Sequence, residues 1–394
     1  MLTSFALLFL VGILFSKFME KIHLPGLLGM ILAGILLGPY CLNMLSPTLL
    51  TISADLRQLA LVLILLRAGL ALDLNDLKKV GRPAIMLCFV PAAIEILAYV
   101  LIGPHLLGLS VIECAIMGAV IAAVSPAVIV PRMLKLMEEH RGTGESIPQM
   151  IMAGASADDV FVIVLFSSFL ALGQGGEFSA GSLFQVPVSI ISGVIVGALI
   201  GLCLCWFFRK VHLRDSIKVL ILFSISFLLL EVETLLEPIW PFSGLLAIMA
   251  MGIAIYSNYR ILAARISSKL SRLWVGAEMM LFVLVGAVVN PAYIMKAGAS
   301  LIMVIFGALI FRMAAVALCL VKTPLNRKER LFCMIAYCPK ATVQAAIGAV
   351  PLAAGLPCGE IVLSAAVLAI LVTAPLGALG IDLTYRKWLK QETD

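Results

Sequence analysis

Charged residues are scarce in this chain. They make up 13% of its 394 residues, whereas about 25% is usual in a soluble domain. Apolar residues make up 62%, and the mean hydropathy is +1.14. A soluble fold of this length could not bury so much apolar surface. The composition also excludes disorder, a collagen-like rod and a disulfide-stapled secreted domain. The remaining class is an all-α polytopic membrane protein.

Several chemical signatures are missing as well. The nine cysteines form no CxxC pair and no Cys/His cluster with metal-ligand spacing, so we interpret them as core residues and expect no cofactor. No nucleotide-binding loop occurs, which argues against an ATP-driven pump. The net charge is +6. In a membrane protein the positions of the basic residues indicate how the chain is oriented in the bilayer, so we do not interpret this charge as a sign of a nucleic-acid partner. The N-terminus lacks a basic region and a cleavage site, so we interpret it as a first spanning helix.

The sequence predicts about thirteen transmembrane helices, because thirteen apolar segments approach the ~20 residues that cross a bilayer. Charged residues, prolines and glycines separate these segments. The predicted ranges are 2–20, 26–44, 57–73, 83–103, 110–135, 147–172, 183–208, 216–235, 241–257, 275–293, 297–321, 331–353 and 359–383.

The basic residues give an independent test of that number. Most of the 28 basic residues fall in alternate loops between the predicted ranges, and the intervening loops contain only Arg57 and Lys296. Because Lys and Arg concentrate in cytoplasmic loops, this pattern predicts an N-terminus outside and a C-terminus in the cytoplasm. A missed or extra helix would scramble the alternation. Three basic residues lie inside predicted spans: Arg67, Arg312 and Lys340.

The odd number of helices predicts an inverted repeat around a linker helix. Matching residues recur at a nearly constant offset in the two halves of the chain, and the second half would run upside down. The matching segments are Gly26-Leu27-Leu28 with Gly34 and Gly244-Leu245-Leu246 with Gly252, then Gly69–Asp73 and Gly286–Asn290, then Glu95 and Arg312. We therefore expect one transporter unit over 1–394, with a first repeat at 1–172, a linker helix at 183–208 and a second repeat at 216–383.

Prolines interrupt corresponding helices in the two halves. The fifth predicted helix contains Ser125-Pro126-Ala127-Val128 with a second proline at Pro131, and the twelfth contains Pro339-Lys340-Ala341-Thr342. A proline inside a helix removes a backbone hydrogen bond and clashes with the preceding turn. Paired breaks of this kind point to a transporter binding site near the membrane midplane, where freed carbonyls face a cavity. The alternative is a simple kink in each helix.

Two adjacent carboxylates, Asp158 and Asp159, lie near the middle of the sixth predicted helix. Each costs about 2.5–3.5 kcal/mol at that depth, so both need partners or a cavity. Carboxylate, hydroxyl and carbonyl oxygens suit a hard monovalent cation, and an acid can trade that cation for a proton. We therefore predict a cation- and proton-binding site for transient Na⁺ or Li⁺ at Asp159, Asp158, Ser156 and Ser125. A structural acid pair that only ties helices together is the alternative.

The other intramembrane charges suggest partners for one another. Lys340 beside the second break is the natural counter-charge for one aspartate, unless it snorkels to an interface. Glu95 and Arg312 occupy equivalent depths, and we predict a structural intramembrane salt bridge between them. Arg67 receives no role, because it lies near a helix end and can reach the interface.

These residues resemble a known family. The chain is similar to the monovalent cation:proton antiporters of the NhaA/NapA-like fold, in particular the NHA-type sodium/proton exchangers of the solute-carrier 9B group. The resemblance covers nearly the whole chain. Its most specific segments are Ser125–Pro131, Asp158-Asp159 and Pro339–Gly348.

The resemblance implies a homodimer with an elevator mechanism and crossed discontinuous helices 5 and 12. A core subdomain, 83–172 and 297–383, would move against a dimerisation subdomain, 1–73 and 183–293. Asp159 would be the principal cation and proton carboxylate, and Asp158 would pair with Lys340 when no cation is bound. The double aspartate resembles the electrogenic branch, in which two protons exchange for one sodium. A bacterial plasma membrane is the expected location, and regulation through a long cytoplasmic tail is not expected.

The predicted function is secondary active exchange of sodium or lithium against protons, by a transporter and not an enzyme. Membrane lipid, Na⁺ or Li⁺ and H⁺ are the expected partners. The alternatives of the same fold are potassium/proton exchange and sodium-coupled uptake of an organic anion. An intramembrane aspartyl protease is disfavoured, because its two aspartates come from separate helices and a GxGD motif is missing here. A passive channel would be excluded by uphill transport.

Overall fold

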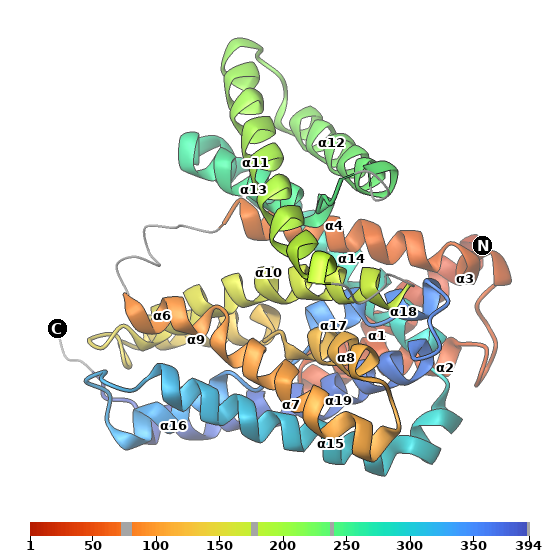
Figure 1. The fold of residues 1–394 in the computed structure, drawn as a ribbon, viewed down its shortest axis with the longest axis vertical. Helices are drawn as coiled ribbons and strands as arrows, with labels where there is room; N and C mark the ends of the chain where they lie inside the picture. The colour runs from red at the N-terminus through yellow and green to blue at the C-terminus, as the bar shows by residue number, and fades with distance from the viewer. Residues whose placement is uncertain (72–80, 175–179, 237–239, 392–394) are drawn as a thin grey trace. The chain divides into compact units, whose positions relative to one another are not determined.

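The computed structural model describes residues 1–71, 81–174, 180–236 and 240–391, and the chain is helical throughout these ranges apart from its connecting loops (Figure 1). It divides into two compact units. The first unit comprises Met1–Ala54, Asn75–Val162 and Met279–Asp394, and the second comprises Asp55–Leu74 and Ile163–Glu278. Every predicted site residue belongs to the first unit.

The first unit holds most of the helices. They are α1 (Leu2–Lys21), α2 (Gly26–Leu37), α3 (Pro47–Thr51), α6 (Arg82–Leu87), α7 (Val90–Leu107), α8 (Val111–Ala122), α9 (Pro126–Glu138), α15 (Pro291–Cys319), α16 (Arg327–Ala336), α17 (Thr342–Ile347), α18 (Val350–Ala353) and α19 (Gly359–Trp388).

The second unit is built mainly from α4 (Ser53–Gly69), α11 (Ala180–Lys210), α12 (Asp215–Leu236) and α13 (Gly244–Asn258). Two long helices contribute residues to both units: α10 (Ile147–Gly173) and α14 (Arg260–Val288).

Nine helices in the described part of the chain are long and apolar enough to cross a membrane. They are Leu2–Lys21, Arg82–Leu107 (α6 together with α7), Val111–Glu138 (α8 together with α9), Ile147–Gly173, Ile191–Lys210, Asp215–Leu236, Arg260–Val288, Gly298–Cys319 and Gly359–Trp388. The chain is therefore a multi-pass membrane protein. Each of the thirteen predicted ranges overlaps at least one helix, but the exact number of crossings stays a prediction.

One predicted span is divided in the structure. The sequence predicts a single helix over 83–103, whereas α6 ends at Leu87 and α7 begins at Val90. Pro91 occupies the first turn of α7, where its missing N–H costs nothing, but it could not sit inside a continuous helix without a clash with the preceding turn. The break therefore falls just before this proline.

Local sequence signals set several helix ends. Ser110 and Glu113 form a reciprocal capping box at the start of α8, and Asn326 and Glu329 form another at the start of α16. These side chains satisfy backbone N–H groups that have no partner within the helix. Gly108 ends α7 with a φ of 68°, a conformation that favours glycine.

Four of the glycines that match between the two halves lie at close helix crossings. A Cβ atom on Gly34 of α2 or on Gly286 of α14 would overlap the backbone of the other helix. In the second unit, Gly69 of α4 and Gly252 of α13 meet in the same way. Glycine is required at these positions because the helix backbones approach too closely for a side chain.

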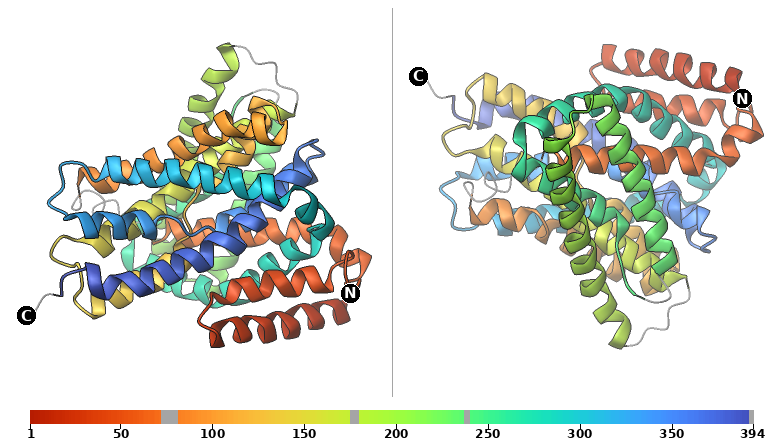
Figure 2. Two further views of the ribbon diagram at one scale, coloured as in Figure 1. Left: turned by 90° about the horizontal axis from the view of Figure 1, so that it is seen from below. Right: turned by 90° about the horizontal axis from the view of Figure 1, so that it is seen from above.

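The core of the first unit forms around α19, whose sides pack against α8, α15 and α16 (Figure 2). α7 packs against both α8 and α15, which brings Glu95 of α7 beside Arg312 of α15. An apolar cluster also joins the first turns of α10 to α16; it includes Ile151, Ala155 and Phe332. These contacts hold the α10 carboxylates near the interrupted helices.

Candidate functional site

Two interrupted helices form the centre of the site. α8 ends at Ala122 and α9 begins at Pro126, so 123–125 is non-helical. α16 ends at Ala336 and α17 begins at Thr342, so 337–341 is non-helical and contains Pro339. Both interruptions fall where the sequence predicts them.

Pro131 does not break its helix, contrary to the prediction. It lies inside α9, which continues to Glu138. Pro131 is the sixth residue of α9, so its missing N–H leaves the Ala127 carbonyl without its usual donor, but the helix continues through it. The neighbouring Arg132 donates from Nη1 to the Val128 carbonyl at 2.9 Å.

The two interruptions contact each other directly. The Ser125 N–H donates to the Pro339 carbonyl at 2.9 Å, and Ser125 Oγ lies 3.5 Å from Thr342 Oγ1. Both hydroxyl residues are buried. The extended segments therefore supply each other with hydrogen-bond partners that the broken helices lack.

The C-terminal end of α8 is covered by side chains of other elements. The carbonyls of Ile121 and Ala123 accept from Gln344 Nε2 at 2.9 and 2.7 Å, and the Ala122 carbonyl accepts from Lys340 Nζ at 3.1 Å and from Arg312. These carbonyls have no partner within their helix. Two cations therefore lie at the negative end of a helix dipole.

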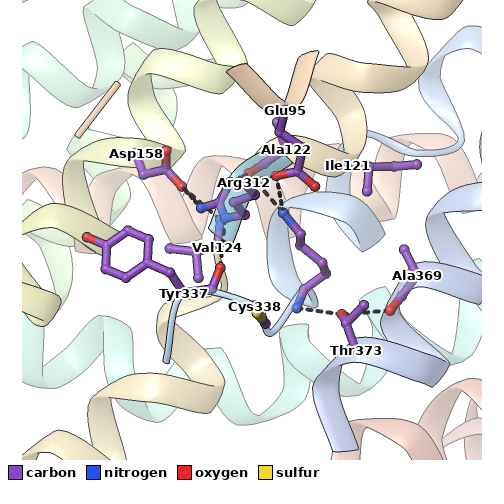
Figure 3. Close-up of polar contacts among 12 residues, drawn as sticks. Glu95, Ile121, Ala122, Val124, Asp158, Arg312, Tyr337, Cys338, Ala369 and Thr373 are labelled. Atoms are coloured by element: carbon purple, nitrogen blue, oxygen red, sulfur yellow. Dashed lines mark hydrogen bonds and ion pairs between the residues drawn. The ribbon is translucent and has the colours of Figure 1, made fainter. Parts of the chain in front are cut away.

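Arg312 joins four groups at this point (Figure 3). Its Nη1 donates to Glu95 Oε2 at 2.7 Å, so the predicted Glu95–Arg312 salt bridge is present. Its Nη2 donates to Asp158 Oδ2 at 2.9 Å, and its Nε donates to the Tyr337 carbonyl at 2.7 Å. Arg312 is fully buried. The fork of a guanidinium allows one side chain to reach several acceptors at once.

Lys340 pairs with Glu95, not with Asp158 as the sequence suggested. Its Nζ lies 2.6 Å from Glu95 Oε2. The backbone explains the choice, because the Lys340 N–H donates to Thr373 Oγ1 at 3.0 Å and this contact fixes the root of the side chain. The cation bound to Asp158 is Arg312.

The two adjacent aspartates have different surroundings. Asp158 is fully buried, and its Oδ2 accepts from the Val124 N–H at 2.9 Å as well as from Arg312. Asp159 is 7% exposed. Its Oδ1 and the Oδ1 of Asp158 have no hydrogen-bond partner among the described residues. The Ser156 side chain lies outside the described residues.

Sequence reasoning assigned no role to three residues of this site. Gln344 covers the end of α8, Thr373 fixes the Lys340 backbone, and Tyr337 supplies a carbonyl to Arg312. Gln344 is the one amide in the otherwise apolar segment that follows the second interruption, and this could have indicated a role for it. Thr373 and Tyr337 carry no comparable signal.

Comparisons with known proteins show the family of this chain. The sequence matches the family described as "Sodium/hydrogen exchanger, transmembrane" over residues 5–387. Sodium/hydrogen exchanger 9B2 of Mus musculus is 33% identical over 384 residues, which cover 93% of this chain and 69% of the relative. The 9B2 exchanger of Homo sapiens is 34% identical over 374 residues, with coverages of 91% and 69%.

A solved structure shows the same fold. The sodium proton antiporter MjNhaP1 from Methanocaldococcus jannaschii, determined at pH 8, superposes with a TM-score of 0.84. The match covers 98% of each chain at 23% identity.

Proposed function

The chain belongs to the sodium/hydrogen exchanger family, and on this premise we propose that it exchanges sodium for protons at Asp158 and Asp159. The observation that supports this proposal is that these two buried carboxylates lie beside two interrupted helices, and that no cationic side chain among the described residues is paired with Asp159. A carboxylate at this depth is stable only with a proton or a cation.

Asp159 is the principal binding carboxylate in this proposal. The four surrounding charges cancel, because Glu95 and Asp158 are balanced by Arg312 and Lys340. Asp159 is left as the one uncompensated charge of this described group. Ser125, Ser156 and Asp158 complete the oxygen set for Na⁺ or Li⁺ in this proposal.

This charge balance favours exchange of one sodium for one proton. Either ligand neutralises Asp159, and the network around it stays neutral in both cases. The resemblance of the double aspartate to electrogenic exchangers favours two protons. The geometry favours one, because Lys340 is bound to Glu95 and Asp158 to Arg312, so neither has to change protonation when the cation binds.

Competition at one site couples the two flows. Na⁺ and H⁺ cannot bind Asp159 together, and only a loaded site permits the core to move. The motion would be of an elevator type, in which 83–172 and 297–383 move against 1–73 and 183–293 within a homodimer.

An inverted repeat accounts for the symmetry of the contacts. The Glu95–Arg312 pair and the Ser125–Thr342 pair both join residues 217 positions apart. Each residue therefore meets its own counterpart in the other repeat, as expected for residues close to a pseudo-two-fold axis. The glycine crossings of α2 with α14 and of α13 with α4 obey the same correspondence.

From the basic loops we propose an N-terminus outside and a C-terminus in the cytoplasm, and a bacterial plasma membrane as the location. The repeats run in opposite directions across the bilayer in this orientation.

Proteoliposomes test the function. A sodium or lithium gradient should drive proton movement, and potassium should not. Asp159→Asn should abolish the flux, and the matched control Asp215→Asn at the start of α12 should keep it. Equal rates with potassium would establish potassium/proton exchange, and uptake that requires an organic anion would establish a symporter. Wild-type flux in Asp159→Asn would refute the carboxylate mechanism.

A further inference from the structure

Tyr337 carries a hydroxyl that the contacts described so far do not use. The side chain is fully buried, and its Oη has no hydrogen-bond partner among the described residues. The ring belongs to an apolar cluster with Ile151, Ala155 and Phe332. A buried hydroxyl without a partner destabilises the fold, and a phenylalanine would avoid that cost.

The hydroxyl is accommodated by a glycine next to the candidate site. A Cβ atom on Gly154 would overlap Tyr337 Oη, so this oxygen lies directly against the backbone of α10. Gly154 precedes Asp158 by one helical turn. Residues one turn apart share a face of a helix, and side chains lean toward the helix N-terminus. Asp158 therefore lies on the same face of α10 as the glycine that Tyr337 Oη contacts.

Asp158 has an oxygen that matches this hydroxyl. Its Oδ2 accepts from Arg312 and the Val124 N–H, but its Oδ1 is buried without a partner. One water bonded to two oxygens can bridge a gap of about 5.5 Å between them. A tyrosine hydroxyl can donate toward such a water, and a carboxylate oxygen can accept from it.

We infer that Tyr337 is a positioning residue for Asp158, and that its hydroxyl and one buried water complete the hydrogen bonding of Asp158 Oδ1. Tyr337 then holds the Asp158–Arg312 pair from two sides, since its carbonyl accepts from Arg312 Nε and the Arg312 Cζ lies 5.7 Å from its ring centroid. The inference rests on the proposed exchange at the two aspartates.

Other titratable groups surround this contact, and their charges enter the same balance. They are Asp159 on α10, Arg312 on α15, Glu95 on α7, Lys340 at the second interruption, Cys88 between α6 and α7, and Cys333 on α16. None of them bonds to Tyr337 Oη. The hydroxyl can therefore be removed without breaking a contact to any of these groups.

Tyr337→Phe is the first test. The loss of the hydroxyl removes a donor from ionised Asp158 and leaves more negative charge beside Asp159, so a proton should bind Asp159 more tightly. The acid limb of the activity–pH profile should move to higher pH by about 0.5–1 unit, with the maximal rate within about twofold of wild type. A profile that coincides with that of wild type would overturn the inference.

Gly154 provides a rescue experiment. The Cβ position of residue 154 overlaps the Tyr337 Oη, so Gly154→Ser combined with Tyr337→Phe returns a hydroxyl to nearly the same place. Gly154→Ala combined with Tyr337→Phe adds the same Cβ without the hydroxyl. Both double variants meet Leu87 Cβ at 2.9 Å and therefore share any local strain.

The serine double variant should recover the wild-type profile, and the alanine double variant should stay shifted. Identical profiles for the two double variants would refute a role for the hydroxyl and leave only packing. Thermal unfolding of each purified variant confirms that the compared proteins are folded. If wild-type protein shows no sodium/proton exchange, the proposed function fails; if wild type exchanges and Tyr337→Phe is unshifted, only this inference fails.

Discussion

The two interrupted helices have similar backbones but opposite chemical roles. The end of α8 presents the carbonyls of Ile121, Ala122 and Ala123 as acceptors, and the second interruption supplies the donors Lys340 and Gln344. Arg312 adds a second cation at the same place. This asymmetry places two positive charges beside Glu95 and Asp158 and leaves Asp159 uncompensated. In the proposed function, these unequal side chains leave one carboxylate available for a cation.

Removal of Arg312 should have the largest effect on this asymmetry. Arg312→Ala leaves Glu95 and Asp158 short of a buried partner, so we expect a loss of about 3–5 kcal/mol in the free energy of unfolding. Arg312→Lys should lose less, because one ammonium cannot reach all the acceptors. Unfolding of the purified protein measures both.

Arg265→Ala is the control for this substitution. The Arg265 side chain is half exposed, and its Nε lies 3.4 Å from Asp215 Oδ2. Its removal should therefore lower the free energy of unfolding by at most about 1 kcal/mol. An equally small loss in Arg312→Ala would contradict the role assigned to the buried network.

Double-mutant cycles distinguish the partner of Lys340. The cycle of Lys340→Met with Glu95→Gln should give a coupling energy of about 2–3 kcal/mol, since their charged atoms are in contact. The cycle of Lys340→Met with Asp158→Asn should give about 1 kcal/mol or less. A larger coupling energy for Lys340 with Asp158 than with Glu95 would support the Asp158–Lys340 pair that the family resemblance implied.

Gln344→Met should have an intermediate effect. The substitution preserves the volume of the side chain but removes both donors from the end of α8. We expect a loss of about 1–2 kcal/mol, because two buried carbonyls lose a partner. Thermal unfolding measures this change, and a variant as stable as wild type would show that the amide does not hold the two interruptions together.

Ser125→Ala should have the smallest effect on stability, within about 0.5 kcal/mol, since the Ser125–Thr342 contact is a long 3.5 Å. The same substitution should raise the KM for sodium several-fold, because the proposed cation site loses an oxygen. Thr342→Ser keeps the hydroxyl and is the control. An unchanged sodium KM in Ser125→Ala would remove Ser125 from the proposed oxygen set.

Much of the fold could be predicted because hydropathy and charge record it directly. The predicted span 216–235 corresponds to the observed helix Asp215–Leu236, and the predicted span 2–20 corresponds to Leu2–Lys21. Proline chemistry placed both interruptions, since a missing N–H has the same consequence in any helix. The constant offset of the repeats also predicted the Glu95–Arg312 contact. Pro131 shows the limit of this reasoning, because α9 continues through it despite the missing N–H.

The partner choices within the site could not be predicted. Spacing along the chain gives depth in the membrane, but it does not determine which of two cations reaches which carboxylate. A hydrogen bond from the Lys340 backbone to Thr373 orients the Lys340 side chain toward Glu95. The guanidinium group of Arg312 forms the ion pair with Asp158. Such contacts depend on how separate helices pack, which no local pattern records.

The dependence of the sodium KM on pH tests the central claim most directly. If one proton and one sodium compete for Asp159, the apparent KM for sodium should rise about tenfold for each unit of pH below the midpoint of proton binding. The maximal rate should stay constant in the same experiment. A sodium KM independent of pH, with a maximal rate that falls instead, would contradict competition at a shared carboxylate. A hundredfold rise per unit would show that two protons compete.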